Sequence, residues 1–267
     1  MIKPTIYPAG SFSSNWRDSF KTALPNFHFS DPRNHRQHAI AKLVEDDMNA
    51  SQGCNVLLAY FQKGYQRGTM TYAEIGAARA RGIPIITVDE DSQEPLFLSV
   101  ASYAFSDKEK AFKLLRSGEY ESKFSPIKQL PEEICKKVLF VGNLENFSQI
   151  IQEIRKTKTC LTSYDSTNLD DFARDVDILV VNFNSGERNR EAIFYMGICY
   201  ALDIPVILCT GNQIVYPPLA GIARRIFPGP NRGAILVDYL NNLNKQDIQS
   251  EAQIYYALEK KYNFLRQ

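Results

Sequence analysis

Residues 75–86, IGAARARGIPII, and residues 196–207, MGICYALDIPVI, are two versions of one segment. In each version an apolar stretch with an internal glycine leads into an Ile-Pro pair and then into a short apolar run. The first part predicts a helix, and the second predicts a buried strand that begins near the proline, where a strand tolerates the missing amide hydrogen. Because the two segments lie in opposite halves of the chain, we infer an internal repeat.

The repeat extends beyond these segments. Strand-like runs that end in a glycine turn open both halves, at residues 4–11 and 137–143, and the apolar runs at residues 54–61 and 176–183 also correspond. Each half alternates predicted strands with predicted helices, an order that is typical of parallel sheets. The sequence therefore predicts an α/β protein built from two copies of one unit.

The two copies set the expected domain boundaries. We expect a first domain over residues 1–116, a linker over residues 117–136, and a second domain over residues 137–267. The linker region is charged and contains two prolines, and a short helix is an option at its end, from Pro131. Apolar spacing after Asp247 predicts a C-terminal amphipathic helix that packs on the body, with partner binding as the alternative.

Composition limits the function classes. The chain has 267 residues, 44% of them hydrophobic and 23% charged, with a net charge of +1, so the overall balance favours neither nucleic acid nor an anionic membrane. No apolar stretch approaches the ~20 residues of a membrane helix. A strand-like run follows the N-terminus without a basic and then a long apolar region, so we expect no leader peptide. The five cysteines are scattered without a Cys-x-x-Cys pair. This pattern argues against structural zinc and favours a reducing, cytoplasmic setting.

Residues 67–76, RGTMTYAEIG, connect two predicted strands. In an open parallel sheet the loop after a strand lies at the carboxyl edge, where ligands bind. We therefore expect Gly68 and Thr69 at that edge as substrate contacts, and Glu74 in the first turn of the helix. A carboxylate there can attack a sugar carbon or stabilise positive charge on it. The alternative is structural, because Thr71 and Glu74 have the spacing of a helix capping box.

The first predicted strand brings further candidates to the same edge. Gly10 and Ser11 follow it and can hold a phosphate at a helix N-terminus, although Ser11 can also serve only as a helix cap. Arg17 is a candidate substrate contact, with helix packing as the alternative. Gly76 is a poor helix former, so we expect a packed strand or a ligand to approach it closely.

The histidines suggest no site of their own. His28, His35 and His38 show no metal-binding pattern with carboxylates, so we expect them on the surface or in the core. The acidic run at residues 89–91 is expected to be a solvated loop.

In order, these motifs resemble the nucleoside 2-deoxyribosyltransferase family and its N-glycosidase relatives. The matching segments are residues 6–11, Trp16 with Arg17, residues 31–33, Asp47, residues 56–61, Gly68 with Thr69, residues 73–77 and residues 83–88. The resemblance implies a flavodoxin- or Rossmann-like fold, with helices on both faces of each parallel sheet. It also implies cleavage of the N-glycosidic bond of a nucleoside or nucleotide, without a cofactor or metal.

The resemblance assigns roles to single residues. Glu74 matches the nucleophile that attacks the anomeric carbon, and Tyr7 matches the tyrosine that positions it. Asn55 stands where the family often has an aspartate. This difference would affect base recognition or proton delivery, if the family aspartate serves either. A general acid must also protonate the departing base, and Asp47 is our candidate. A second base as acceptor would give transfer, and water would give hydrolysis.

The second copy departs from this pattern. Tyr195 takes the place of Glu74, and Glu191 lies about one helical turn earlier. We expect a catalytically degenerate unit that serves as the neighbouring subunit from which this family commonly borrows residues, with a homo-oligomer as another option. The expected partner is a small nucleoside or nucleotide. Rival functions are NAD glycohydrolysis by the same glutamate, and non-catalytic nucleotide binding or sensing.

Overall fold

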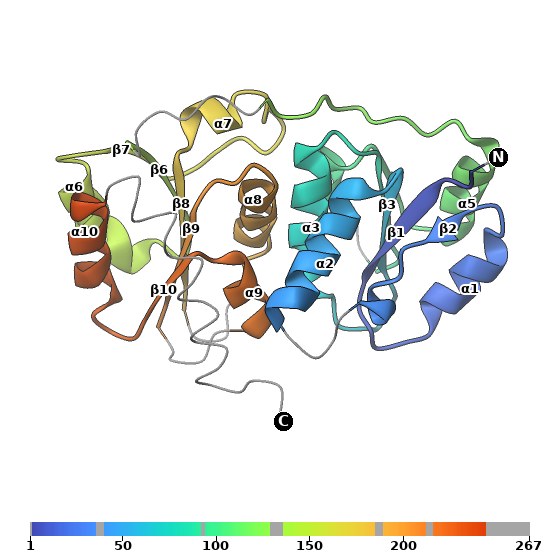
Figure 1. Ribbon diagram of the computed structural model, residues 1–267, viewed down its shortest axis with the longest axis horizontal. Coiled ribbons are helices and arrows are strands. Elements are labelled where there is room, and N and C mark those ends of the chain that lie inside the picture. The colour runs from blue at the N-terminus through green and yellow to red at the C-terminus, as the bar shows by residue number, and fades with distance from the viewer. Residues whose placement is uncertain are drawn as a thin grey trace.

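The computed structural model describes residues 2–35, 40–91, 94–128, 136–184, 189–211 and 216–243, which form two five-stranded parallel sheets with helices around them (Figure 1). The first unit contains β1 (Thr5–Gly10), α1 (Trp16–Ala23), β2 (His28–Phe29), the 3-10 helix η1 (Pro32–Asn34), α2 (Ile40–Gly53), β3 (Val56–Phe61), α3 (Thr69–Ala80), β4 (Ile85–Asp89), α4 (Pro95–Val100), β5 (Tyr103–Phe105) and α5 (Lys108–Ser117). The second unit contains β6 (Lys137–Gly142), the 3-10 helix η2 (Glu145–Phe147), α6 (Ser148–Ile154), β7 (Thr159–Leu161), α7 (Phe172–Asp175), β8 (Ile178–Phe183), α8 (Arg190–Ala201), β9 (Val206–Thr210), α9 (Pro217–Ile222), β10 (Arg225–Pro228) and α10 (Arg232–Asn242).

Both sheets have the same strand order. The first runs β2-β1-β3-β4-β5 and the second β7-β6-β8-β9-β10, and every pair of neighbours is parallel. This is the flavodoxin-like order, in which the chain crosses to the other side of its first strand after the second strand. The predicted fold of two tandem flavodoxin-like units is therefore confirmed.

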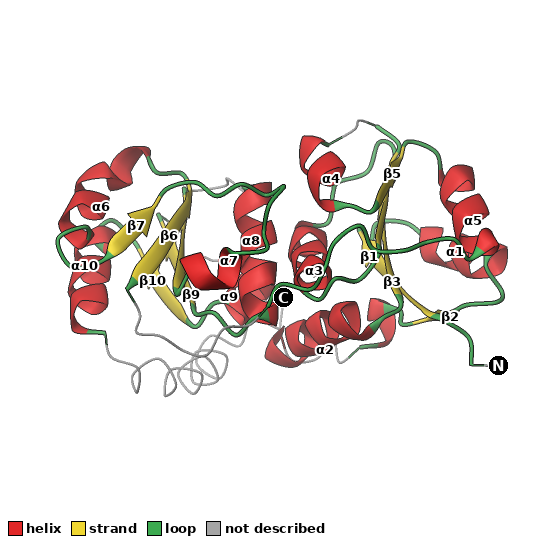
Figure 2. Ribbon diagram, turned by 90° about the horizontal axis from the view of Figure 1, so that it is seen from above, coloured by secondary structure: helices red, strands yellow, loops and turns green. Residues whose placement is uncertain are grey.

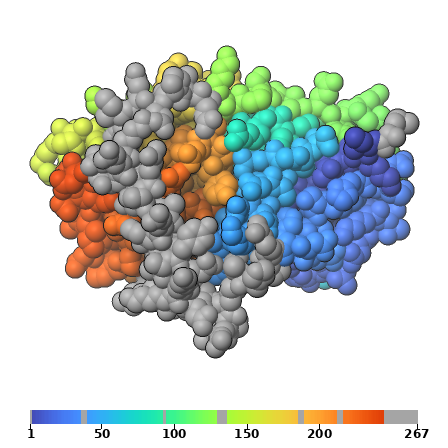
Figure 3. Space-filling model, viewed as in Figure 1, coloured from blue at the N-terminus to red at the C-terminus, as the bar shows by residue number. Residues whose placement is uncertain are grey.

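Helices cover both faces of each sheet. Helices α1 and α5 lie on the outer face of the first sheet, and α6 and α10 on the outer face of the second (Figure 2). Helices α2, α3, α8 and α9 lie between the two sheets, and their apolar side chains join one core that includes residues of both units. The space-filling view shows the first unit pressed directly against the second along this seam (Figure 3).

Two glycines make the central helix contact. A Cβ atom added to Gly76 on α3 would lie 2.1 Å from the carbonyl oxygen of Phe194 on α8. One added to Gly197 on α8 would lie 1.9 Å from the carbonyl oxygen of Ala73 on α3. Because any side chain would collide with the opposite backbone, both positions require glycine. The close neighbour expected for Gly76 is thus a helix of the second unit, not a strand or a ligand.

The connection between the units also packs on α3. Residues 118–128 form neither helix nor strand, yet Ile127 is buried and its amide donates to the carbonyl of Ala80 at 2.9 Å. The options of a short helix from Pro131 and of a C-terminal helix after Asp247 fall outside the described residues. No helix in the described part of the chain combines the length and apolar character of a membrane span.

Candidate active site

Glu74 lies in the second turn of α3 and not in the first. The helix begins at Thr69 after Gly68, which has no side chain to cap it, and Thr71 is already inside the helix. The capping box of Thr71 and Glu74 therefore does not form, because it requires the threonine at the cap position. Instead, Glu74 Oε1 accepts a hydrogen bond of 2.8 Å from the hydroxyl of Tyr7.

The Tyr7–Glu74 pair is enclosed between β1 and α3. The side chain of Tyr7 points from β1 into the core on the α3 side of the sheet, and Glu74 is 5% exposed. Burial, followed by the charge of Glu74, raises the pKa of Tyr7 well above its usual range. The phenol therefore stays protonated and remains a hydrogen-bond donor to Glu74.

A second buried acid, Asp47 on α2, belongs to the same cluster. Its Oδ1 lies 2.6 Å from Nδ1 of His35, the residue that follows η1. The His35 ring stacks on the Tyr7 ring with 6.4 Å between centroids. The sequence predicted a role for Asp47, whereas for His35 it predicted only a place on the surface or in the core. No spacing signal connects them, because one lies on a loop and the other on a helix.

The two carboxyl groups shift each other's ionisation. Burial raises the pKa of Glu74 to about 8, and the nearby charge of Asp47 adds to the effect, whereas the Tyr7 hydrogen bond opposes it. Burial raises the pKa of Asp47 to about 7, and the charge of Asp46 adds to it. Two buried carboxylates in one site do not both ionise readily. Near neutral pH this pair therefore holds at least one proton.

Arg17 lies beneath the loop after β1 and is almost completely buried. Its Nη2 donates to the carbonyl of Gly10 at 2.7 Å and its Nη1 to that of Ser11 at 3.0 Å, while Nε donates to that of Pro8. Its Nε also lies 3.9 Å from the carboxylate of Asp31. These contacts fix the loop, so Arg17 acts on the site through the backbone and not as the direct substrate contact expected from the sequence.

The loops after β1 and β3 meet at the carboxyl edge of the first sheet. A Cβ atom added to Gly68 would lie 3.2 Å from the carbonyl carbon of Gly10 and 3.3 Å from the amide nitrogen of Ser11. Thr69 follows as the first residue of α3. The structure thus brings together the four edge residues that the sequence analysis selected.

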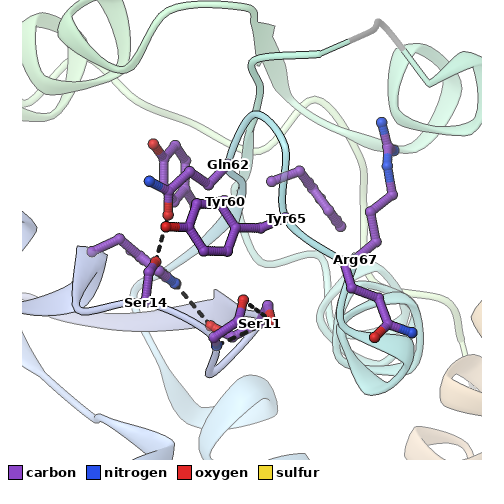
Figure 4. A pocket seen from close by; sticks show the side chains of 10 residues that line it. Ser11, Ser14, Tyr60, Gln62, Tyr65 and Arg67 are labelled. Carbon is purple, nitrogen blue, oxygen red and sulfur yellow. Dashed lines mark hydrogen bonds between the residues drawn. The ribbon is translucent and has the colours of Figure 1, made fainter.

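A shallow, open depression with a cavity volume of about 10 Å³ lies between these two loops (Figure 4). It is lined by Ser11, Ser13, Ser14, Trp16, Tyr60, Phe61, Gln62, Tyr65, Gln66 and Arg67. The strand order reverses between β1 and β3, so the depression lies at the switch point where such folds bind ligands. Glu74 and Tyr7 lie deeper and do not line it.

Asn55 lies away from these residues. It immediately precedes β3, and its Oδ1 accepts a hydrogen bond of 2.7 Å from the amide of Thr5 at the start of β1. The start of a parallel strand is at the amino edge of the sheet, opposite the ligand edge. The structure therefore gives the Asn55 side chain a structural contact, away from the other predicted site residues. Asp177 has the same task in the second unit, where it accepts from the amides of Lys136 and Lys137.

At the matching position of the second unit, the described residues include no buried acid pair. The hydroxyl of Tyr195, the counterpart of Glu74, donates to the carbonyl of Tyr164 at 2.8 Å and lies 3.2 Å from Glu191 Oε1. Leu139 takes the register position of Tyr7. Across the described ranges, no three His, Cys, Asp or Glu side chains are placed to share a metal ion.

Comparisons with known proteins add little to this geometry. No family model and no curated protein matches the sequence. One similar solved structure is the Escherichia coli RcsC C-terminus with its linker region and phosphoreceiver domain, at 13% identity and a TM-score of 0.28, covering 98% of this chain and 96% of that one. Another is the catalytic subunit of cobaltochelatase from Mycobacterium tuberculosis, at 14% identity and a TM-score of 0.30, covering 79% of this chain and 22% of that one. The fold assignment therefore depends on the strand order itself.

Proposed function

We propose that this protein cleaves the N-glycosidic bond of a nucleoside or nucleotide, with Glu74 as the nucleophile. The observation that carries the proposal is the 2.8 Å hydrogen bond from the Tyr7 hydroxyl to Glu74, beside the second buried acid Asp47. One carboxylate to attack carbon and one carboxylic acid to protonate a leaving group are the two groups that glycosidic cleavage by a covalent route requires.

The chemistry balances with these groups. An oxygen of ionised Glu74 forms a bond to the anomeric carbon while the carbon–nitrogen bond breaks and its electron pair goes to the base. Asp47 gives its proton to the departing nitrogen. A second base or water then attacks the same carbon and releases Glu74. The Tyr7 hydrogen bond favours the negative charge on Glu74. Burial still leaves Glu74 the higher pKa of the two acids, about 8 against about 7 for Asp47. The proposal therefore requires substrate binding to place the proton of the pair on Asp47.

The depression at the carboxyl edge is the proposed route for the ligand. Along α3, the rise from Thr69 at the edge to Glu74 is about 7.5 Å, a distance that a sugar and its base span. The lining offers aromatic faces and amide and hydroxyl groups, which suit a polar planar ring. Because Glu74 is 5% exposed, the side chains above it must separate when substrate binds.

The second unit supports the site mechanically in this proposal. Helix α8 packs against α3, the helix that carries Glu74, through the glycine contact. A tandem copy thus stands where a neighbouring subunit would stand in a dimer. We also propose a reducing, cytoplasmic setting, which the free thiols of Cys54, Cys199 and Cys209 support.

The test is a screen for released base. Deoxynucleosides, ribonucleosides, their 5′-monophosphates and NAD are incubated with the protein and analysed by chromatography. We expect Glu74→Gln to reduce release by about 10³-fold or more, because an amide cannot act as the nucleophile. Glu191→Gln is the matched control, since Glu191 also lies beside a tyrosine hydroxyl on the corresponding helix. Equal activity of wild-type protein and Glu74→Gln would contradict the assignment.

Non-catalytic nucleotide binding is the second candidate, and the burial of Glu74 favours it. Calorimetry with the same compounds separates the two functions. Binding of a nucleoside or nucleotide with no released base, in wild-type protein as in Glu74→Gln, would select the binding function. Release from NAD alone would select the NAD glycohydrolase instead.

A further inference from the structure

His35 connects the two halves of the buried acid cluster. Its Nδ1 lies 2.6 Å from Oδ1 of Asp47, and its ring stacks on Tyr7, whose hydroxyl donates to Glu74. The ring therefore contacts one proposed catalytic carboxyl group directly and the hydrogen-bond partner of the other. The proposed cleavage mechanism gives the His35 ring no role.

We propose that His35 is the positioning residue of the proton donor: its Nδ1–H donates to Oδ1 of Asp47 and thereby keeps the acidic proton on Oδ2. The inference rests on the proposed function, in which Asp47 protonates the leaving base. In the opposite arrangement, the Asp47 hydroxyl would donate to an unprotonated Nδ1, and the proton would be held by the imidazole and not offered to substrate.

The surroundings of the ring favour the first arrangement. A neutral imidazole carries one N–H and one lone pair, and the tautomer is set by its neighbours. The carboxyl group of Asp47 contacts this ring, and the charges of Asp46 and Glu74 act on it from α2 and α3. Asp31 acts on it as well, although its carboxylate is paired with Lys21 and Arg33. Tyr7 faces it from β1. An N–H directed at carboxyl oxygens is stabilised there, whereas a lone pair would be repelled.

The same hydrogen bond serves both states of Asp47. Before cleavage, Asp47 is neutral, with its proton on Oδ2 and its Oδ1 accepting from His35. The Oδ2 proton passes to the departing nitrogen, which also receives the electron pair of the broken bond. The carboxylate that remains still accepts from Nδ1–H, so the ring need not reorganise. Solvent returns one proton to Asp47 after the products leave.

The tautomer is measurable without any substrate. In the full chain labelled with ¹⁵N-histidine, long-range ¹H–¹⁵N spectra at neutral pH should show His35 protonated at Nδ1. Asp47→Ala should return the ring to the Nε2–H form that is usual in peptides. His28, which is exposed on β2, is the internal reference. A wild-type His35 protonated at Nε2 would overturn the proposal.

Kinetics then test the positioning role. His35→Phe keeps a ring against Tyr7 but removes the N–H, whereas His35→Asn places an amide N–H where Nδ1 was. With 2′-deoxyguanosine we expect His35→Phe to slow base release about 10- to 100-fold, and His35→Asn to restore most of the rate. With 7-methyl-2′-deoxyguanosine, whose base leaves without protonation, His35→Phe should match wild-type protein within about threefold.

The outcomes separate this inference from the proposed function. Equal slowing of both compounds in His35→Phe would mean a structural role and overturn the inference. If wild-type protein releases no base from any compound in the screen, the proposed function fails, while the spectra still decide which nitrogen of His35 carries the proton.

Discussion

At the helix in the centre of the molecule, the first unit carries Glu74 and the second carries Tyr195. Three features around this position agree between the units: the strand order, the glycine on each helix and the Ile-Pro segment that follows. Among the described residues, the first unit encloses two carboxyl groups near a tyrosine hydroxyl, whereas the second has Tyr195 at the position of Glu74 and Leu139 at that of Tyr7. Apolar pattern and glycine contact are therefore sufficient for this fold. A buried acid pair costs stability, so its presence in the first unit supports the proposal that it has a function there.

Substituting either glycine at the contact between α3 and α8 should destabilise the protein by a similar amount. This is the largest loss of stability that we expect. Gly76→Ala and Gly197→Ala each place a methyl group against the opposite helix backbone, so each should lower the free energy of unfolding by about 3 kcal/mol or more. Urea denaturation measures the loss. Gly53→Ala, at a helix position with open space around it, is the control. A loss at only one of the two central glycines would refute the symmetric contact.

The acid pair should make stability depend on pH in the first unit alone. Burial raises the pKa of Glu74 to about 8 in the folded state, above its unfolded value, so the folded state binds more protons between these values. The contribution of Glu74 to stability is thus complete below its unfolded pKa and is lost as pH rises toward 8. Glu74→Gln should gain on the order of 2 kcal/mol over wild-type protein between pH 5 and pH 8. In thermal or urea unfolding across this range, Glu191→Gln should follow wild-type protein.

The two units also differ on their first strands, where β1 carries Tyr7 and β6 carries Leu139. Tyr7→Phe removes the hydrogen bond to Glu74 but keeps the ring, and we expect base release to fall about tenfold, the effect of about 1.4 kcal/mol. Tyr195→Phe, the same change in the second unit, is the comparison and should leave the rate unchanged. Initial rates at saturating substrate measure both variants. A Tyr7→Phe enzyme with the wild-type rate would remove Tyr7 from the mechanism.

The smallest expected effects come from Asn55 and Asp177, which do the same structural work in the two units. Asn55→Ala removes the side-chain acceptor of the Thr5 amide, and Asp177→Ala removes that of Lys136 and Lys137. Each should cost about 1 kcal/mol in denaturant unfolding. Base release should not change in either variant. A large kinetic defect in Asn55→Ala would restore the substrate role that its position at the amino edge argues against.

The fold was predictable because its signals are local. Helix and strand periods, the recurring Ile-Pro segment and the glycine on each helix all lie within short windows. The partner of Gly76 was not predictable, because a glycine shows that something is close but not what. Asn55 was expected among the substrate contacts, but it precedes β3. The residue before a parallel strand lies at the edge of the sheet opposite the ligand loops.

The site was only partly predictable. Glu74 and Tyr7 came from resemblance and loop position, and the structure places them in hydrogen-bond contact. The role of Arg17 in holding backbone carbonyls depends on how the loop after β1 folds over it, which no spacing reveals. His35 was missed because its contact with Asp47 joins a loop to a helix.

Helix α3 places Glu74 against Tyr7 of β1 and packs its Gly76 against helix α8. If the gene were divided between the halves, the front half would expose a broad apolar helix surface whose natural complement is a surface of the same kind. Two copies of that half would then associate through Gly76 and place two acid pairs in one assembly. The present chain resembles such a dimer with its two members joined covalently. Its second member keeps the helix contact but has Tyr195 where the first has Glu74.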